Sequence, residues 1–135
     1  MKRYRVILTE EQLMLIAQCV EDCHRFACGQ TELWNTTSQF NIKNQAELRN
    51  QLQKLQPLVT PELEYMASYD WAGNGCKDKH QKRFIAKTYA IYREILHKII
   101  NDGIYKCSTL TCDEGGQVPI IEAIENWQYN IRQKE

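Results

Sequence analysis

The spacing of apolar residues changes near residue 10, and this change predicts the first two elements of the chain. Residues 4–9 combine aromatic and β-branched side chains in a short run that is typical of a strand. Thr9 and Gln12 then have the spacing of a capping box, which opens a helix. Apolar positions three and four apart follow on one predicted face, namely Leu13, Ile16, Ala17, Val20, Cys23, His24 and Ala27.

The middle of the chain predicts two shorter helices. Asn44 and Glu47 form a second capping-box pattern, and Pro57 is expected to end the helix that it starts. Thr60 precedes a proline, which is a further start signal, for a short helix over residues 61–67. The apolar stripe of the first of these helices consists of Leu48, Leu52 and Leu55.

The C-terminal half predicts one long helix followed by a hairpin. A broad apolar stripe marks a helix over residues 79–102. Residues 104–112 and 118–124 resemble strands, and the turn at 113–116 joins them. We therefore expect an α+β fold in a single domain, residues 1–135, with about three helices. The N-terminal strand and the C-terminal hairpin would form a small antiparallel sheet against these helices. The stripe of the long helix contains Phe84, Ile85, Thr88, Ile91, Tyr92, Ile95, Leu96 and Ile99.

Charge and hydropathy indicate whether the protein binds a nucleic acid or a membrane. The chain has 17 basic and 17 acidic residues among 135, so it has no global field that would concentrate a nucleic acid polymer. No segment approaches the roughly 18 apolar residues that cross a bilayer, and the N-terminus lacks the apolar core of a signal peptide. We therefore expect a cytoplasmic protein with neither a membrane nor a nucleic acid polymer as partner.

The six cysteines are consistent with that compartment. In a reducing cytosol, we expect buried and inert thiols rather than disulfides. Cys19 and Cys23 lie four apart beside His24, but a zinc site needs two further ligands, and none has a suitable spacing. Cys107 and Cys112 are too far apart for a zinc knuckle. The sequence therefore predicts no metal site and no cofactor.

The common catalytic signatures are missing from the sequence. It contains no nucleophile elbow, Walker A motif, dinucleotide fingerprint or His-Glu-x-x-His motif. The three histidines, His24, His80 and His97, stand apart in sequence. We therefore predict that the protein is not an enzyme.

One segment has the composition of an anion site. Trp71 precedes the turn Gly73-Asn74-Gly75, and the cationic start of the long helix follows. Helix N-termini accept anions, and Lys82 and Arg83 oppose the helix dipole unless an anion binds there. Trp71 offers a ring for base stacking, and Asn74 lies where glycines allow close approach of a ligand. The alternatives are an ordinary turn, a core tryptophan and a solvated cationic end offset by Asp78.

Two further regions supply candidate ligand contacts. Arg25 suits stacking on a base and forked binding of phosphate, and Gln30 lies in a segment rich in hydrogen-bonding groups. The alternative for Arg25 is a salt bridge with a nearby acid. On the predicted hairpin, Lys106 and Thr109 have suitable chemistry, although Thr109 would equally suit a solvated face.

Several blocks of the sequence resemble small proteins encoded by phages and prophages, and in particular the first described class of anti-Thoeris proteins. The resemblance covers most of the chain. It rests on residues 8–13, 20–22, 25–30, 69–75, 84–89 and 92–94.

The resemblance implies a phage protein that sequesters a cyclic nucleotide immune signal without cleaving it. Its ligands would be glycocyclic ADP-ribose and, for some members, cyclic oligonucleotides. Arg25 would sandwich the adenine, with Phe84 as a second contact, although the place of Phe84 in the apolar stripe favours the core. The family implies a homo-oligomer, a dimer or larger, with ligand at the subunit interfaces, in the cytoplasm of an infected bacterium. Its expected basic residues near the C-terminus correspond here only to Lys106 and Arg132.

Two other classes of function stay open. The protein would instead be a phage inhibitor that masks a host protein, of the anti-CRISPR or host-regulator type, with exposed aromatic residues such as Trp34 or Trp127 at the interface. Alternatively, it would be a phosphodiesterase that uses His80 and Asp70 near the same glycine turn.

Overall fold

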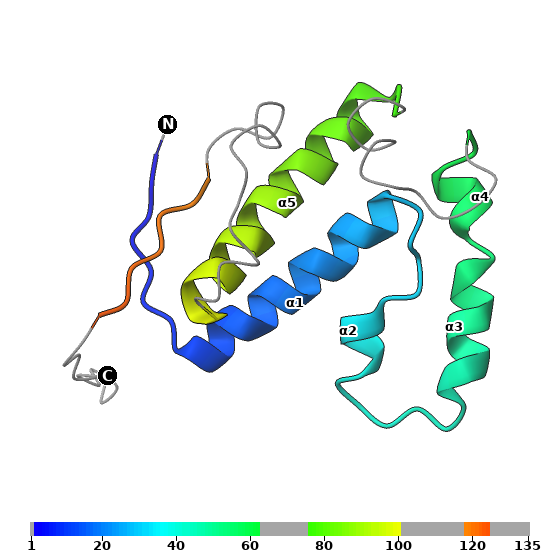
Figure 1. Cartoon of the computed structure of the whole chain (residues 1–135), viewed down its shortest axis with the longest axis horizontal. Coiled ribbons are helices and arrows are strands. Elements are labelled where there is room, and N and C mark those ends of the chain that lie inside the picture. The colour runs from blue at the N-terminus through cyan, green and yellow to red at the C-terminus, as the bar shows by residue number, and fades with distance from the viewer. Residues whose placement is uncertain (1, 63–75, 101–117, 125–135) are drawn as a thin grey trace.

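The structure is a computed structural model that describes residues 2–62, 76–100 and 118–124. Two long helices dominate it, α1 (Glu10–Ala27) and α5 (Lys79–Ile100). They pack against each other in antiparallel directions, because the end of α1 meets the beginning of α5 (Figure 1).

Among the described residues between them in sequence, three shorter helices occur. They are α2 (Trp34–Thr37), α3 (Gln45–Gln53) and α4 (Gln56–Val59). Figure 1 shows α3 and α4 beyond the α1–α5 pair, on the side where α1 ends. No residue of α3 is buried, so this helix contributes little to the core.

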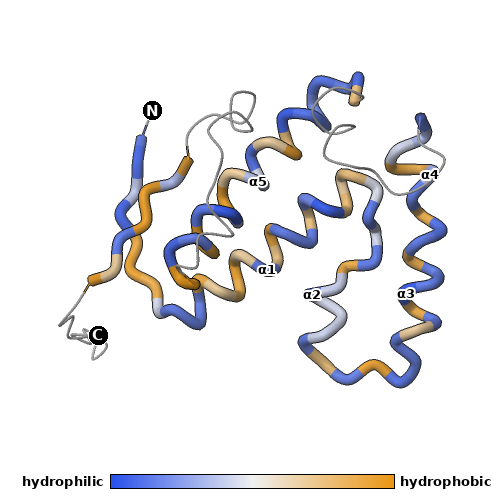
Figure 2. Tube along the Cα trace, in the orientation of Figure 1, coloured by the Kyte–Doolittle hydropathy of each residue, from blue (hydrophilic) through white to orange (hydrophobic). Residues whose placement is uncertain are grey.

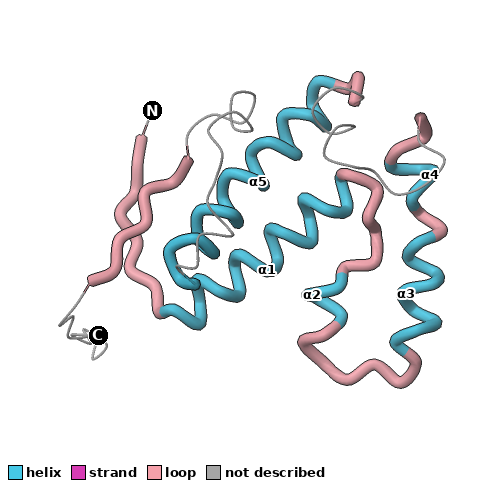
Figure 3. The backbone as a smooth tube through the Cα atoms, in the orientation of Figure 1, coloured by secondary structure: helices cyan, strands magenta, loops and turns pink. Residues whose placement is uncertain are grey.

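The predicted sheet is wrong for the part of the chain that the structure describes. There, residues 2–9 and 118–124 are extended but form no strand, and all regular structure is helical (Figure 3). The other predicted strand, 104–112, lies outside the described residues. The α+β expectation is therefore corrected to a helical fold in this part.

The physical reason is that strand propensity measures how well a side chain fits a half-buried sheet. The residues of the N-terminal segment are instead exposed, with Tyr4 81% and Val6 66% accessible. Figure 2 shows apolar residues along both extended segments. Sequence composition alone could not show that these residues have no sheet to pack on in the described structure.

The predicted start of α1 is confirmed. The Thr9 hydroxyl accepts from the Gln12 amide at 3.1 Å, and the Gln12 side-chain oxygen accepts from the Thr9 amide at 2.9 Å. At α3, the Asn44 side chain caps the Glu47 amide at 3.0 Å. The prediction that Pro57 ends α3 is wrong: α3 ends at Gln53, and Pro57 lies in the first turn of α4, where a missing N–H costs nothing.

The core forms where the apolar stripes of α1 and α5 meet. Ala17 is fully buried beneath Tyr92, Ile95 and Leu96, and Ile121 of the C-terminal extended segment packs on the same group. A second cluster consists of Ala27, Cys28, Cys76 and Ile85. Within the predicted stripes, Ile16, Cys23, Phe84 and Ile91 are exposed instead.

Gly29 fixes the exit of the chain from α1. Its φ of +92° is unfavourable for any residue with a Cβ, and a Cβ there would lie 2.7 Å from the Thr60 hydroxyl oxygen. Thr60 is itself fully buried. We expect Gly29→Ala to lower the free energy of unfolding by about 2 kcal/mol through backbone strain and overpacking. Urea unfolding measures this loss.

Two further variants test the cause. In a Thr60→Ala background, the clash is relieved, so the additional cost of Gly29→Ala should fall. An unchanged midpoint for Gly29→Ala itself would contradict the close approach to Thr60.

Candidate functional site

The candidate site lies where α1 ends and α5 begins. The Gln81 side-chain amide donates to the Ala27 carbonyl at 2.8 Å and to the Val59 carbonyl at 3.1 Å. These two bonds join the ends of α1 and α4 to the first turn of α5. The structure thereby places the residues around Arg25 and those around Lys82 at the same end of the helix pair.

Cationic residues surround the first turns of α5. Lys77, Lys79 and Arg83 are exposed and Lys82 is half-buried. Phe84, the second aromatic candidate, is 46% exposed and thus does not belong to the core. Asp78 places a negative charge among these cations. Its carboxylate accepts a hydrogen bond from the backbone amide of Gln81 at 2.8 Å and so caps the helix. The helix start is therefore partly satisfied by its own chain.

Arg25 and Gln30 are brought together, as a shared site requires. The Arg25 guanidinium donates to the Gln30 side-chain oxygen at 2.8 Å. It also donates twice to one Glu21 oxygen, at 3.1 and 3.0 Å, which confirms the intrahelical salt bridge considered from the sequence. The Arg25 side chain remains 39% exposed. Glu21 and Gln30 therefore fix the plane of a partly accessible guanidinium.

The remaining predicted contacts fall outside the described residues. These are Trp71, Asn74, Lys106 and Thr109, and the same holds for Asp70 of the phosphodiesterase alternative. They stay predictions.

A buried histidine and cysteine lie beside the site but do not form an activated pair. His24 Nδ1 lies 2.9 Å from the Ile85 carbonyl oxygen, which can only accept, so Nδ1 carries the proton. Its Nε2 lies 3.9 Å from Cys28 Sγ. Burial lowers the pKa of His24 to about 4, with the nearby Arg25 also lowering it. Burial raises the pKa of Cys28 to about 12.

This pair therefore holds a neutral imidazole and a protonated thiol at neutral pH. A nucleophilic cysteine needs the opposite shift, toward thiolate. The ring of His24 instead packs against Tyr89 and Tyr92, at centroid distances of 5.5 and 5.3 Å. The pair is consequently part of the core rather than a catalytic centre.

Sequence reasoning missed an acid that organises the loop after α1. Asp22 is 2% exposed, and its carboxylate accepts from the amides of Asn35 at 3.1 Å and Thr36 at 2.6 Å. These bonds stabilise the start of α2, where Leu33 has a left-handed φ of 53°. No spacing rule signals this contact, because it joins residues 13 and 14 positions apart.

A second unpredicted feature is an arginine stacked on a tryptophan at the surface. The Arg49 guanidinium lies 4.0 Å from the centroid of the Trp34 ring, which is 53% exposed. Arg49 also donates to the Thr37 hydroxyl at 3.1 and 3.0 Å, which holds α3 against α2. The residue types suit an interface, but their pairing across the chain depends on the fold.

The expectation that the cysteines are buried is confirmed for only some of the described ones. Cys28 and Cys76 are buried, whereas Cys19 and Cys23 are exposed on α1. Among the residues that the structure describes, no cluster of potential ligands could hold a metal ion. In the same part of the chain, no helix has the length and apolar character needed to span a membrane.

Comparisons with known proteins identify no relative. No protein-family model matches the chain, and no curated protein or solved structure matches it.

Proposed function

We propose that this protein binds and sequesters a cyclic nucleotide immune signal without catalysis. The ligand class is glycocyclic ADP-ribose or a cyclic oligonucleotide. The observation that carries the proposal is the Gln81 bond to the Ala27 carbonyl, which ties the first turn of α5, with Lys82 and Arg83, to the end of α1, where Arg25 binds Gln30.

The chemistry of these groups suits such a ligand. A guanidinium whose plane is fixed by Glu21 and Gln30 is prepared for stacking on a purine. Lys82 and Arg83 would form charge-assisted hydrogen bonds with phosphate oxygens. The exposed Phe84 ring offers a further stacking surface. Together, these contacts provide affinity without a nucleophile.

The setting of this activity follows from the same proposal. The protein would act in the cytoplasm of an infected bacterium as a homo-oligomer, a dimer or larger. Ligand bound at subunit interfaces would dissociate slowly, because release would then require subunits to move. Trp71, Asn74, Lys106 and Thr109 would complete the pocket.

A binding and release experiment tests the proposal. The pure protein is incubated with cyclic ADP-ribose isomers and with cyclic di- and trinucleotides, freed of unbound material and heat-denatured. Mass spectrometry then identifies what is released. Recovery of an intact nucleotide near one per site would support sequestration. A converted product would favour the phosphodiesterase alternative, with His80 and Asp70 as the residues to replace, and no recovered nucleotide would contradict the proposal.

The cationic start of α5 gives a mutational prediction. We expect Lys82→Ala with Arg83→Ala to weaken binding of the recovered nucleotide at least about 100-fold, since each lost charged hydrogen bond costs about 1.5–3 kcal/mol. Isothermal titration calorimetry measures the affinity. The matched control is Lys87→Ala with Lys98→Ala, which removes two exposed cations farther along the same helix. Equal affinities for the two double variants would place the site elsewhere.

A protein-masking role is the second candidate, and the Trp34–Arg49 pair favours it. An exposed tryptophan stacked with arginine has the composition of an interface hot spot. This role predicts that the release experiment yields no nucleotide and that a host protein is retained on the immobilised chain.

A further inference from the structure

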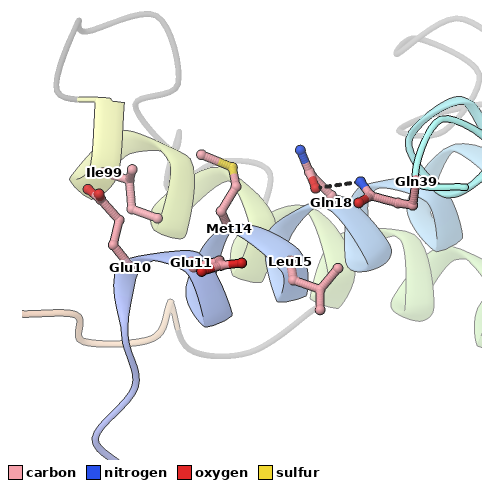
Figure 4. Close-up of a pocket in the computed structure, with 7 residues that line it drawn as sticks. All are labelled: Glu10, Glu11, Met14, Leu15, Gln18, Gln39 and Ile99. Carbon is pink, nitrogen blue, oxygen red and sulfur yellow. Dashed lines mark hydrogen bonds between the residues drawn. The ribbon is translucent and has the colours of Figure 1, made fainter.

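A shallow groove runs along the outer face of α1, away from the candidate site. It has a volume of about 460 Å³, and Figure 4 shows its side chains. Its apolar surface comes from Met14 and Leu15 of α1 and from Ile99 of α5. Leu15 is 50% exposed and lies between Glu11 and Gln18 along the groove (Figure 4).

The two ends of the groove differ in charge. Glu10 and Glu11 lie at the end where α1 begins. At the other end, the Gln39 side-chain amide donates to the Gln18 side-chain oxygen at 3.0 Å and bridges the loop after α2 to α1. The groove therefore combines an apolar part with one acidic end and one neutral polar end.

The extended segment at residues 2–8 has the complementary character. Lys2, Arg3 and Arg5 are exposed cations. Tyr4, Val6 and Leu8 alternate with the arginines, so they share one side of an extended chain. These apolar side chains are 81%, 66% and 37% exposed. In the described structure, this segment thus presents to solvent both an apolar side and a positive charge.

We propose that residues 2–8 of one copy of the protein occupy this groove on a second copy. Tyr4, Val6 and Leu8 would cover Met14, Leu15 and Ile99. The flexible side chains of Arg3 and Arg5 would fold toward the carboxylates of Glu10 and Glu11. By two-fold symmetry, residues 2–8 of each copy would bind in the groove of the other copy, which yields a closed dimer.

Dimensions agree with this occupant. Glu10 and Gln18 are separated by about 12 Å of helix at 1.5 Å per residue. An extended segment of seven residues spans about 23 Å at 3.3 Å per residue, so it is long enough to follow the groove.

A second copy is favoured over the chain's own segment. The capping box fixes Thr9 in an extended conformation at the start of α1. Figure 4 shows the chain before Glu10 leading away from the labelled groove residues. To enter its own groove, the segment would have to reverse direction and break the cap, which stabilises the start of the helix. A segment from another copy has no such constraint.

Sedimentation velocity on the full chain over a concentration series tests this dimer. We expect a reversible dimer that weakens as salt is raised, because part of the attraction joins opposite charges. We expect Leu15→Asp to raise the dimer dissociation constant at least about tenfold, the loss typical of a central interface side chain. Leu58→Asp is the matched control, since Leu58 is 81% exposed on α4 and outside the groove; it should leave the constant unchanged.

Reversing the charges on the segment and on the groove distinguishes this interface from other modes of dimerisation. Arg3→Glu with Arg5→Glu should give a monomer, and so should Glu10→Lys with Glu11→Lys. Mixing the two double variants should restore a mixed dimer, because the acidic segment then meets a basic groove. Circular dichroism shows whether each variant keeps its helices. Should the lysine variant unfold, Glu10→Gln with Glu11→Gln replaces it and should weaken the dimer.

Several results would overturn the proposal. They are a wild-type chain that stays monomeric up to roughly millimolar concentration, a dimer that persists in Leu15→Asp, and a mixture of charge variants that forms no mixed dimer. None of these measurements includes a nucleotide, so their outcome is independent of the proposed ligand.

Discussion

Replacing Tyr92 with alanine should lower the free energy of unfolding by about 4 kcal/mol, as expected for truncating a large core aromatic. Tyr92 is 1% exposed and lies between the two long helices. It packs with Ala17, Ile95 and Leu96, and its ring meets those of His24 and Tyr89. The cavity left by alanine would remove contacts from both helices at once. Urea unfolding measures the loss.

The neighbouring residue on α5 provides the control. Ile91 is 37% exposed, so Ile91→Ala removes apolar atoms from the same helix with far less burial. We expect it to cost about 1 kcal/mol at most. Equal losses for the two variants would contradict the packing of α1 against α5 through Tyr92.

The stability of the protein should fall as pH is lowered from neutral, because His24 must stay neutral in the folded state. Burial lowers the folded-state pKa of His24 from 6.5 to about 4. Between these values, the unfolded chain binds the proton and the folded chain does not, so lowering the pH favours unfolding. The expected loss is about 1.4 kcal/mol per pH unit and about 3 kcal/mol in total.

A His24→Gln variant isolates this contribution. Urea unfolding at pH 7 and pH 5 should show the wild type losing roughly 2 kcal/mol more than the variant. The control His80→Gln removes an exposed histidine at the start of α5 and should keep the wild-type dependence. A wild-type chain whose stability falls no more than that of His24→Gln would mean that His24 is already accessible to protons.

The helices follow from local sequence because their signals are local. Thr9 with Gln12 and Asn44 with Glu47 lie three residues apart, and capping depends only on such neighbours. The apolar spacing likewise predicted a helix over residues 79–102, and the described residues of this stretch are helical from Lys79 to Ile100. The prediction of a sheet was wrong because a strand depends on a partner strand, and no local pattern specifies that partner.

The sequence could indicate which residue types suit the candidate site, but not which of their side chains contact each other. The chemistry of Arg25 and Gln30 is visible in the sequence, but their contact depends on the turn at Gly29 that brings Gln30 back to the helix. The bond from Gln81 to the end of α1 could not be predicted, because a glutamine in a cationic helix start gives no signal by itself. Asp22 and Arg49 were missed because their partners are distant in sequence.

The sequence by itself determined where α1, α3 and α5 begin, the period of the apolar positions on α1 and α5, and the cationic character of the start of α5. These properties depend on interactions within a few residues. Only the tertiary structure decided that His24 is buried and neutral, that Phe84 and Leu15 are exposed, and that residues 2–8 are left without a sheet. Burial and partner choice depend on how whole helices pack, since the same apolar stripe can face a core, a groove or another chain.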